Sequence, residues 1–184
     1  MKTFLISDLH LGHDGVYRFT HKNTGKRIRP WARSSSEGDE LLKKRWNDTV
    51  SENDRVYILG DVAIPRKGLD KLSELNGRKI LIRGNHDIFK LRDYEKYFDD
   101  VRGSHKLDDY ILTHIPIHHD SVPRWSKGNI HGHLHSDLVF KKNWLGVKKI
   151  DTRYINVCVE HVNATPVDFN LILNGSFKNK LFTE

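Results

Sequence analysis

The chain has 184 residues, of which 37% are hydrophobic and 30% are charged, so it is long enough to enclose one core and we expect a single domain over residues 1–184. No apolar run approaches the roughly 18 residues of a membrane span, so we expect no membrane partner. A net charge of +7 favours anionic partners such as nucleic acid or phosphorylated small molecules. The single cysteine, Cys158, excludes an internal disulfide framework. The acidic Asp8 follows the start too early for a signal peptide, and we expect a cytoplasmic location.

The first half of the chain alternates short apolar runs with helical patterns. We predict strands over residues 3–6, 55–59 and 79–83, and helices over 37–50 and 69–75. This alternation is typical of a mostly parallel sheet with right-handed crossovers. Each predicted strand leads into side chains that can bind a metal, and these are Asp8 and His10, then Asp61, then Asn85 and His86. Because ligands bind beyond the carboxyl ends of parallel strands, we expect these side chains to lie together.

The second half has a different pattern. We predict a helix over residues 88–98 and a hairpin in which Asp108 and Asp109 join strands within 101–107 and 110–113. A last strand is predicted over residues 154–159, and a short final helix is predicted to start within 165–168. The sequence shows no repeat, low-complexity tract or linker.

The twelve histidines are concentrated in a few places. His114 stands at a predicted strand end, and His131, His133 and His135 share one side of the chain if it is extended. Imidazole is the commonest side-chain ligand of transition metals, so these clusters favour a metal site.

Two basic segments point to an anionic substrate. Residues 16–36 combine arginines and lysines with aromatic side chains, and they form either a loop that grips phosphate or an ordinary surface excursion. Paired lysines occur again at 141–142 and 148–149. Cations beside aromatic rings suit free nucleotides or single-stranded nucleic acid.

Five blocks of residues resemble, in order, the signature of the calcineurin-like metallophosphoesterases: Asp8-x-His10, Gly60-Asp61, Gly84-Asn85-His86-Asp87, Thr113-His114 and Gly132-His133-x-His135. Together they span residues 8–135. The opening Asp-Leu-His-Leu-Gly-His and the compact length look like the small phosphoesterases of bacteria and their phages.

The resemblance implies an α/β fold with mixed sheets, a four-layer αββα sandwich around two divalent metal ions. Asp8, His10 and His135 would hold the first ion, Asn85, His114 and His133 the second, and Asp61 would bridge them. His86 would be the catalytic proton donor, and Asp87 would orient it. The oxygen and nitrogen ligands suit Mn, which we expect, or Fe, Zn, Ni or Co. Two such ions would activate a hydroxide for attack on phosphorus.

Three further residues are predicted to bind substrate. His13 either touches the substrate phosphate or lines the pocket, Arg29 belongs to the basic segment, and His131 is either a supporting residue or a ligand in a shifted register.

The function expected from these residues is phosphoester hydrolysis, with nucleotides, cyclic nucleotides or nucleic-acid ends as diester substrates. A phosphomonoesterase or protein phosphatase is the alternative within hydrolysis. A non-catalytic metal-binding scaffold is the alternative outside it, although every ligand position and His86 is filled. Homodimers occur among proteins of this resemblance, so a homodimer is a further expectation.

Overall fold

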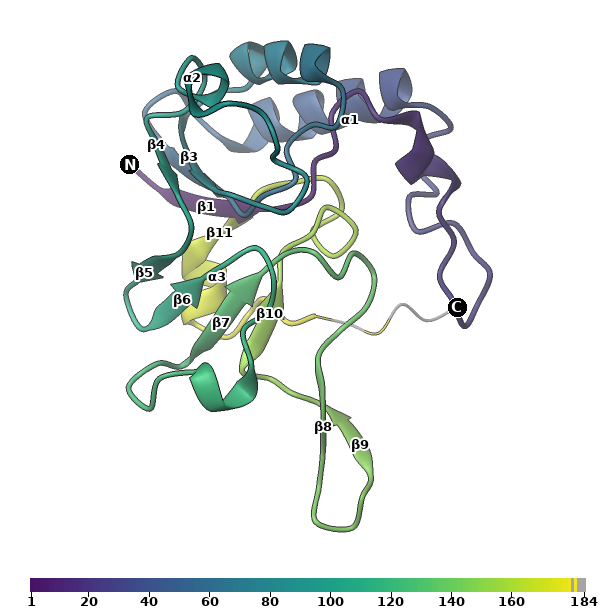
Figure 1. The fold of residues 1–184 in the computed structure, drawn as a ribbon, viewed down its shortest axis with the longest axis vertical. Helices are drawn as coiled ribbons and strands as arrows, with labels where there is room; N and C mark the ends of the chain where they lie inside the picture. The colour runs from purple at the N-terminus through teal and green to yellow at the C-terminus, as the bar shows by residue number, and fades with distance from the viewer. Residues whose placement is uncertain (180, 182–184) are drawn as a thin grey trace.

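The structure, a computed structural model, describes residues 1–179 and 181 and contains two β-sheets packed face to face (Figure 1). The first sheet has the order β11-β1-β2-β3-β4. Its strands are β1 (Thr3–Ile6), β2 (Arg55–Ile58), β3 (Arg78–Ile82), β4 (Asp100–Arg102) and β11 (Val167–Asp168). β1 to β4 are parallel and only the edge strand β11 runs antiparallel.

The second sheet has the order β10-β7-β6-β5. Its strands are β5 (His105–Leu107), β6 (Tyr110–Leu112), β7 (Gly128–His131) and β10 (Tyr154–Asn156). β6, β7 and β10 are parallel and β5 is antiparallel to β6. A separate hairpin is made of β8 (Phe140–Lys142) and β9 (Lys148–Ile150).

The helical elements form an uneven cover. The helices α1 (Ser35–Thr49) and α2 (Leu91–Tyr94) and the 3₁₀ helix η2 (Arg66–Glu74) lie over the outer face of the first sheet (Figure 1). In the described part of the chain, the other helical elements are short: η1 (Asp14–Arg18), η3 (His119–Ser121) and α3 (Phe169–Leu173). The predicted mixed α/β sandwich is confirmed.

The core follows from the apolar strands. β1, β2 and β3 carry fully buried aliphatic side chains, and α1 closes their outer face with Leu42 and the completely buried Trp46. The Trp46 indole N–H donates to the Asn76 carbonyl at 2.9 Å, so its one polar atom is satisfied. α1 begins with Ser34, whose hydroxyl accepts the Glu37 N–H. The predicted helix over 37–50 is thus confirmed.

The two sheets are joined at their carboxyl edges. The Ser7 N–H donates to the Val157 carbonyl at 2.9 Å, and the Val159 N–H donates to the Ser7 carbonyl at 3.1 Å. The chain just beyond β1 therefore pairs with the chain just beyond β10. Because β1–β3 and β6, β7 and β10 each end at this junction, the loops that follow all these strands converge on one place.

Two expectations about the second half were wrong. The predicted helix over 88–98 is reduced to α2, because the carbonyls of Asp87 and Phe89 are bonded by the Arg83 guanidinium and the apolar Ile88 lies 76% exposed. The predicted strand over 101–107 is two strands in different sheets, since β4 extends the first sheet and the chain then crosses to β5. The hairpin turn at Asp108 is confirmed.

The described residues include no helix of the length and apolar character needed to cross a bilayer.

The carboxylate of Asp54 ties β1 to the turn before β2. It accepts the Lys2 N–H at 2.7 Å and the Ser51 N–H at 3.0 Å, and these two bonds hold the pKa of Asp54 below its usual value. A lowered folded-state pKa stabilises the protein above the unfolded pKa of about 4, and this contribution is lost as the pH falls through and below that value. We expect the stability gap between wild type and Asp54→Ala, measured by urea unfolding, to narrow between about pH 5 and pH 2. Asp48→Ala, which changes an exposed helix carboxylate, should show no such narrowing; an unchanged gap for Asp54→Ala would contradict the assignment.

Candidate metal centre

The loops beyond the strand ends hold their side chains in an uncommon backbone conformation. Five of the seven predicted ligands have positive φ angles, namely Asp8 (58°), His10 (50°), Asp61 (53°), His133 (68°) and His135 (48°). Residues with a side chain rarely adopt this left-handed region, and each such residue costs of order 1–3 kcal/mol. The surrounding fold holds this strain so that consecutive polar side chains turn toward one point.

The first group of predicted ligands is assembled as expected. The Nε2 atom of His10 lies 3.7 Å from Asp8 Oδ1, and the Nε2 atom of His135 lies 3.9 Å from the same oxygen. These three residues can each direct a ligand atom at one ion. Asp8 Oδ1 and both ring nitrogens of His10 are buried without a hydrogen-bond partner in the described protein. Buried polar atoms are normally bonded, so this set fits a cation that would satisfy them.

The other oxygen of Asp8 is fixed by the protein. Asp8 Oδ2 accepts the His133 N–H at 2.8 Å and lies 2.6 Å from the Ser7 hydroxyl and 3.1 Å from the Cys158 thiol. Burial opposes ionisation of Asp8, but the nearby imidazoles of His10, His135 and His114 outweigh it, so the pKa of this carboxyl lies well below its usual range. Asp8 is therefore an ionised carboxylate with one oxygen free to bind a cation.

The second group surrounds His114. Its Nε2 atom lies 2.9 Å from Asn85 Oδ1 and 3.4 Å from Asp61 Oδ2, and its ring is 5.2 Å from that of His133. Its Nδ1 atom lies 2.7 Å from the Leu59 carbonyl, which fixes Nε2 as the atom that faces the site. Burial disfavours a charged imidazole here, yet the bond to Asp61 and the charge of Asp8 raise the pKa of His114 to about 9. The carboxylates of Asp61 and Asp8 therefore favour a positive charge at this position.

Asp61 stands between the two groups. Its Oδ2 atom is 3.8 Å from His10 Nε2 and 3.4 Å from His114 Nε2, while its Oδ1 atom accepts the His86 N–H at 2.9 Å. The structure thus brings all seven predicted ligands to one junction, with Asp61 in the position predicted for a bridge.

Glycines let these loops approach each other. A Cβ on Gly84 would overlap the Asp61 carboxylate, and one on Gly132 would overlap Ser7 Oγ and Asp8 Oδ2. Gly60 has a φ of 89° and its Cβ would collide with Gly84 and the His114 ring. The glycines of the sequence blocks are therefore required by close packing beneath the ligands.

Arg29 corrects one expectation. It was predicted to bind substrate, but its side chain is fully buried, with only 1% of the residue exposed. Its Nε donates to Glu160 at 2.8 Å, and its two terminal nitrogens donate to the carbonyls of Asp8 (2.6 Å) and Leu9 (3.2 Å). Arg29 therefore supports the ligand loop from inside instead of facing solvent.

Glu160 was missed by the sequence reasoning. Its Oε1 atom accepts from Arg29 and lies 3.0 Å from His135 Nδ1, so it orients this imidazole with Nε2 toward Asp8. Burial would raise the pKa of Glu160, but the Arg29 charge and the His135 bond lower it to about 2. An acidic residue directly after the apolar run 157–159 was the signal that could have revealed it.

The predicted role of Asp87 is also revised. Its carboxylate accepts three backbone N–H groups, from Gly84 at 2.7 Å, Asp61 at 2.9 Å and Val62 at 3.0 Å. No bond from Asp87 to the His86 ring is found among the described residues. Asp87 holds two ligand-bearing turns together, whereas the exposed His86 ring stands 5.9 Å from the His10 ring, at the mouth of the site.

The remaining two predicted substrate residues differ in position. His13 is half-buried with its ring 6.1 Å from that of His10, so it borders the site. His131 is fully buried, its Nδ1 lies 2.8 Å from the Gly132 carbonyl, and burial lowers its pKa to about 4. The position of His131 matches a neutral supporting residue, one of the two roles considered for it, and does not match direct contact with substrate.

Comparison with known proteins shows which family the chain belongs to. The family model of calcineurin-like phosphoesterases matches residues 1–174. The chain belongs to this family. A protein of Methanocaldococcus jannaschii, described as uncharacterized protein MJ1445, is 31% identical over 98% of this chain and 94% of its own length. The Gene 66 protein of Mycobacterium phage L5 is 30% identical over 77% of this chain and 81% of its own.

A solved structure shares the fold. The crystal structure of AQ665 from Aquifex aeolicus, described as a protein of unknown function, superposes with a TM-score of 0.64 and covers 94% of this chain and 98% of that one, at 20% sequence identity. Family membership makes this chain a metallophosphoesterase, a metal-binding hydrolase of phosphoesters, and Asp8, Asp61 and the surrounding histidines are its candidate ligands. The phosphoester is the part of the substrate that the family establishes.

The contact between Glu160 and His135 leads to a first test at the site. Glu160→Gln keeps the size of the side chain but removes the charge that pairs with Arg29 and orients His135. Loss of such a supporting partner typically weakens metal binding about 10- to 100-fold, and we expect that loss in a calorimetric titration with Mn²⁺. Glu74→Gln, which changes an exposed glutamate paired with Lys43, is the control. If Glu160→Gln bound Mn²⁺ with wild-type affinity, the Glu160 carboxylate would not be needed to position His135.

The close packing under Asp8 gives a second test. Gly132→Ala places a methyl group against Ser7 and Asp8, and we expect a loss of about 1–3 kcal/mol in the free energy of unfolding together with weaker metal binding. Gly103→Ala is the matched control, because a Cβ there meets nothing within 4 Å. Equal stability of the two variants in urea would refute the packing argument.

Proposed function

We propose that this metallophosphoesterase is a phosphodiesterase that uses two divalent metal ions, with nucleotides, cyclic nucleotides or nucleic-acid ends as substrates. The observation that carries the two-ion proposal is the position of Asp61 Oδ2 between His10 of one ligand group and His114 of the other. Asp8, His10 and His135 would hold one ion, Asn85, His114 and His133 the other, and Asp61 would contact both. The unpaired buried atoms of Asp8 and His10 fit this assignment.

When bound, the ions would supply Lewis-acid polarisation of the phosphoryl group and lower the pKa of a bound water. The protein supplies the geometry. Asp61 is held by the His86 N–H through its other oxygen, and Asp8 is held by Ser7, His133 and Cys158. These fixed carboxylates need no rearrangement during the reaction, which is the property that makes an electrostatic site effective.

His86 is proposed as the proton donor to the leaving oxygen. Its backbone N–H is bonded to Asp61 while its ring is exposed at the mouth, so substrate can reach the imidazole and a candidate metal ligand together. His13 borders the same mouth and is proposed to contact the substrate phosphate. Arg29, Asp87 and His131 act indirectly by holding the ligand loops.

The proposed metal rests on the types of ligand atom, and the proposed substrate class rests on the net charge of the chain. Oxygen and nitrogen ligands accept Mn²⁺, our first choice, as well as Fe, Zn, Ni or Co. The net charge of +7 favours nucleotide-like anions over neutral substrates. A cytoplasmic location and a homodimer remain part of the proposal. A phosphomonoesterase, a protein phosphatase and a non-catalytic scaffold are the alternatives that the following experiment distinguishes.

The test compares hydrolysis of bis-p-nitrophenyl phosphate and p-nitrophenyl phosphate, with Mn²⁺ or with a chelator, for wild type and His86→Ala. We expect metal-dependent turnover that favours the diester and falls about 100-fold or more in the variant, because a positioned general acid contributes roughly 10²- to 10⁴-fold. His119→Ala, at an exposed histidine of η3, is the control.

Other outcomes of this experiment have definite meanings. Preference for the monoester would replace the diesterase proposal with a phosphomonoesterase. Bound metal without turnover on either ester or on a panel of nucleotides would support the scaffold. Full activity of His86→Ala would reject His86 as the proton donor.

A further inference from the structure

The β8–β9 hairpin projects from the body of the molecule as an arm. It is not part of either large sheet and extends away from both, next to β10 (Figure 1). We call residues 140–150 the arm. The turn at its tip is fixed by hydrogen bonds. Asn143 Oδ1 accepts the N–H groups of Leu145 at 3.0 Å and Val147 at 2.8 Å, and Gly146 adopts a φ of 77°.

The arm places like charges directly opposite each other. In the antiparallel register Lys141 faces Lys149 and Lys142 faces Lys148. Since successive residues of a strand point to opposite faces, each face of the arm carries one lysine pair. Like charges directly opposite are destabilising in a hairpin, and all four lysines are exposed. Asp151, 3.7 Å from Lys141, offsets part of this repulsion, and a polyanion bound along the arm would remove the rest.

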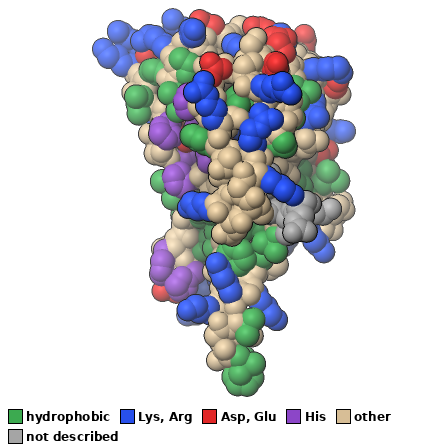
Figure 2. Space-filling model, turned by 90° about the vertical axis from the view of Figure 1, so that its right-hand side faces the viewer, with side chains coloured by type: hydrophobic (Ala, Val, Ile, Leu, Met, Phe, Trp, Pro, Cys, Tyr) green, Lys and Arg blue, Asp and Glu red, His purple; other side chains and the backbone are tan. Residues whose placement is uncertain are grey.

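The tip of the arm is apolar and exposed. Trp144 has 91% of its surface exposed, Leu145 64% and Val147 52%. Figure 2 shows basic side chains along the projecting arm and apolar side chains at its end. An exposed indole beside cations is the arrangement on which unpaired bases stack.

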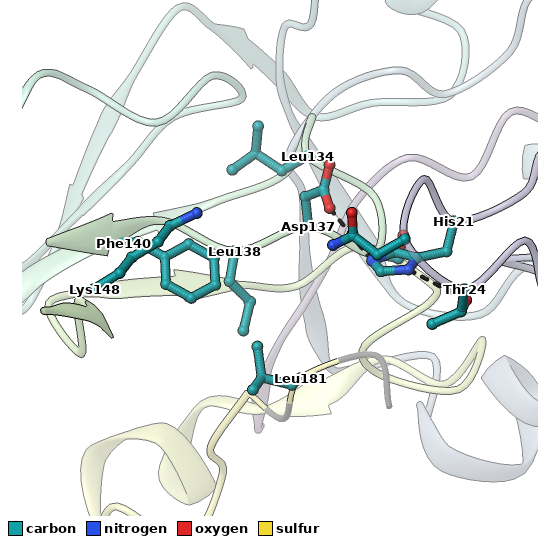
Figure 3. Close-up of a pocket in the computed structure, with 10 residues that line it drawn as sticks. His21, Thr24, Leu134, Asp137, Leu138, Phe140, Lys148 and Leu181 are labelled. Atoms are coloured by element: carbon teal, nitrogen blue, oxygen red, sulfur yellow. Dashed lines mark hydrogen bonds and ion pairs between the residues drawn. The ribbon is translucent and has the colours of Figure 1, made fainter. Parts of the chain in front are cut away.

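The arm is continuous with the candidate metal centre. β8 begins five residues after His135, so at most roughly 18 Å of extended chain separates the two. Phe140 and Lys148, whose ammonium lies 4.2 Å from the Phe140 ring centre, form one wall of a cavity of about 730 Å³ (Figure 3). Its opposite wall includes His21 and Thr24.

A second cavity leads from there to the metal ligands. It has a volume of about 310 Å³ and is lined by His133 and His135, and it shares four residues with the first cavity: His21, Leu134, Ser136 and Asp137. The surface from the metal centre to the base of the arm is therefore hollowed along residues 133–140. An elongated ligand bound at the centre can continue along this path.

We propose that the arm binds single-stranded nucleic acid and holds the strand so that it runs from Trp144, over the cavity beside Phe140, to the metal centre. Lys142 and Lys149 contact phosphates and Trp144 stacks on a base. The binding step stands on the arm alone, while delivery of the strand to the centre rests on the proposed phosphodiesterase function. A membrane seated on the apolar tip would engage neither the cavity nor the lysines on both faces, so a strand fits the charge pattern better.

The test measures binding of a phosphorothioate oligothymidylate of about a dozen nucleotides, a length within the usual site size, to the metal-loaded protein by fluorescence anisotropy. The slowly cleaved linkages keep the measurement independent of turnover. We expect Trp144→Ala to bind at least about 5-fold more weakly, from the loss of one stacked base. Trp125→Ala, at a second exposed tryptophan outside the arm, is the matched control.

The lysines are tested by the salt dependence of binding. Lys142→Gln/Lys149→Gln removes one charge from each face, and neither lysine takes part in an ion pair or ring contact within the described structure. We expect the slope of log K against log salt to fall in magnitude by about 1.4, since each phosphate contact on a single strand contributes about 0.7. Lys67→Gln/Lys96→Gln, which removes two exposed lysines far from the arm in sequence, is the charge-matched control. Its slope of log K against log salt should equal that of the wild type.

Several results would overturn the proposal. Equal oligonucleotide binding by the arm variants and their controls would reject it. The arm would be a membrane contact if the wild type bound phosphatidylserine vesicles more tightly than the oligonucleotide, and if Trp144→Ala lost vesicle binding but kept oligonucleotide binding. A dimer that dissociates in Trp144→Ala, seen by sedimentation velocity with unchanged oligonucleotide binding, would make it a subunit contact. Failure of wild-type diester hydrolysis would instead reject the proposed function and leave the binding result intact.

Discussion

The pairing of the chain at Ser7 with residues 157–159 is the constraint on which the site depends. Neither sheet by itself presents all of the candidate ligands. β1 leads to Asp8 and His10, and β2 and β3 lead to Asp61 and Asn85, whereas β6 and β7 lead to His114, His133 and His135. Two backbone hydrogen bonds at Ser7 fix the edges of the sheets against each other. The carboxylate of Asp8, next in the chain, then bonds to His133 from the other sheet. The same junction therefore holds the two sheets together and brings the candidate metal ligands to one place.

The centre is costly to maintain without cations. Five strained residues, an ionised Asp8 in the interior and unpaired nitrogens on His10 are all destabilising in isolation. The buried pair Arg29–Glu160 compensates part of this, because it bonds the carbonyls beside Asp8 and orients His135 at once. A bound cation would satisfy the remainder, so metal binding and folding stability should be coupled in this protein.

The surface beside the candidate metal centre is hollowed toward the arm, which fits the elongated substrate proposed above. His86 is exposed beside the candidate ligands, and the hollow along residues 133–140 leads from His133 and His135 to the arm. Phe140 belongs to both the cavity and β8, so the arm and the hollow form one surface. In the proposed binding mode, the lysines of the arm would attract a polyanion before it reaches the candidate metal ligands.

The sequence determined the parts of this protein that depend on local pattern. Apolar runs ending in Asp8, Asp61 and Asn85 predicted β1, β2 and β3 and the polar edge of a parallel sheet, because strand periodicity and glycine turns are encoded within a few residues. Tertiary structure decided what depends on partners distant in the chain. Arg29 looked like a surface cation until Glu160, 131 residues away, was seen to pair with it in the interior. Asp87 looked like a partner for its neighbour His86 and instead bonds the turn at Asp61 and Val62. Burial and long-range hydrogen bonding set these roles, and neither has a signature in local sequence.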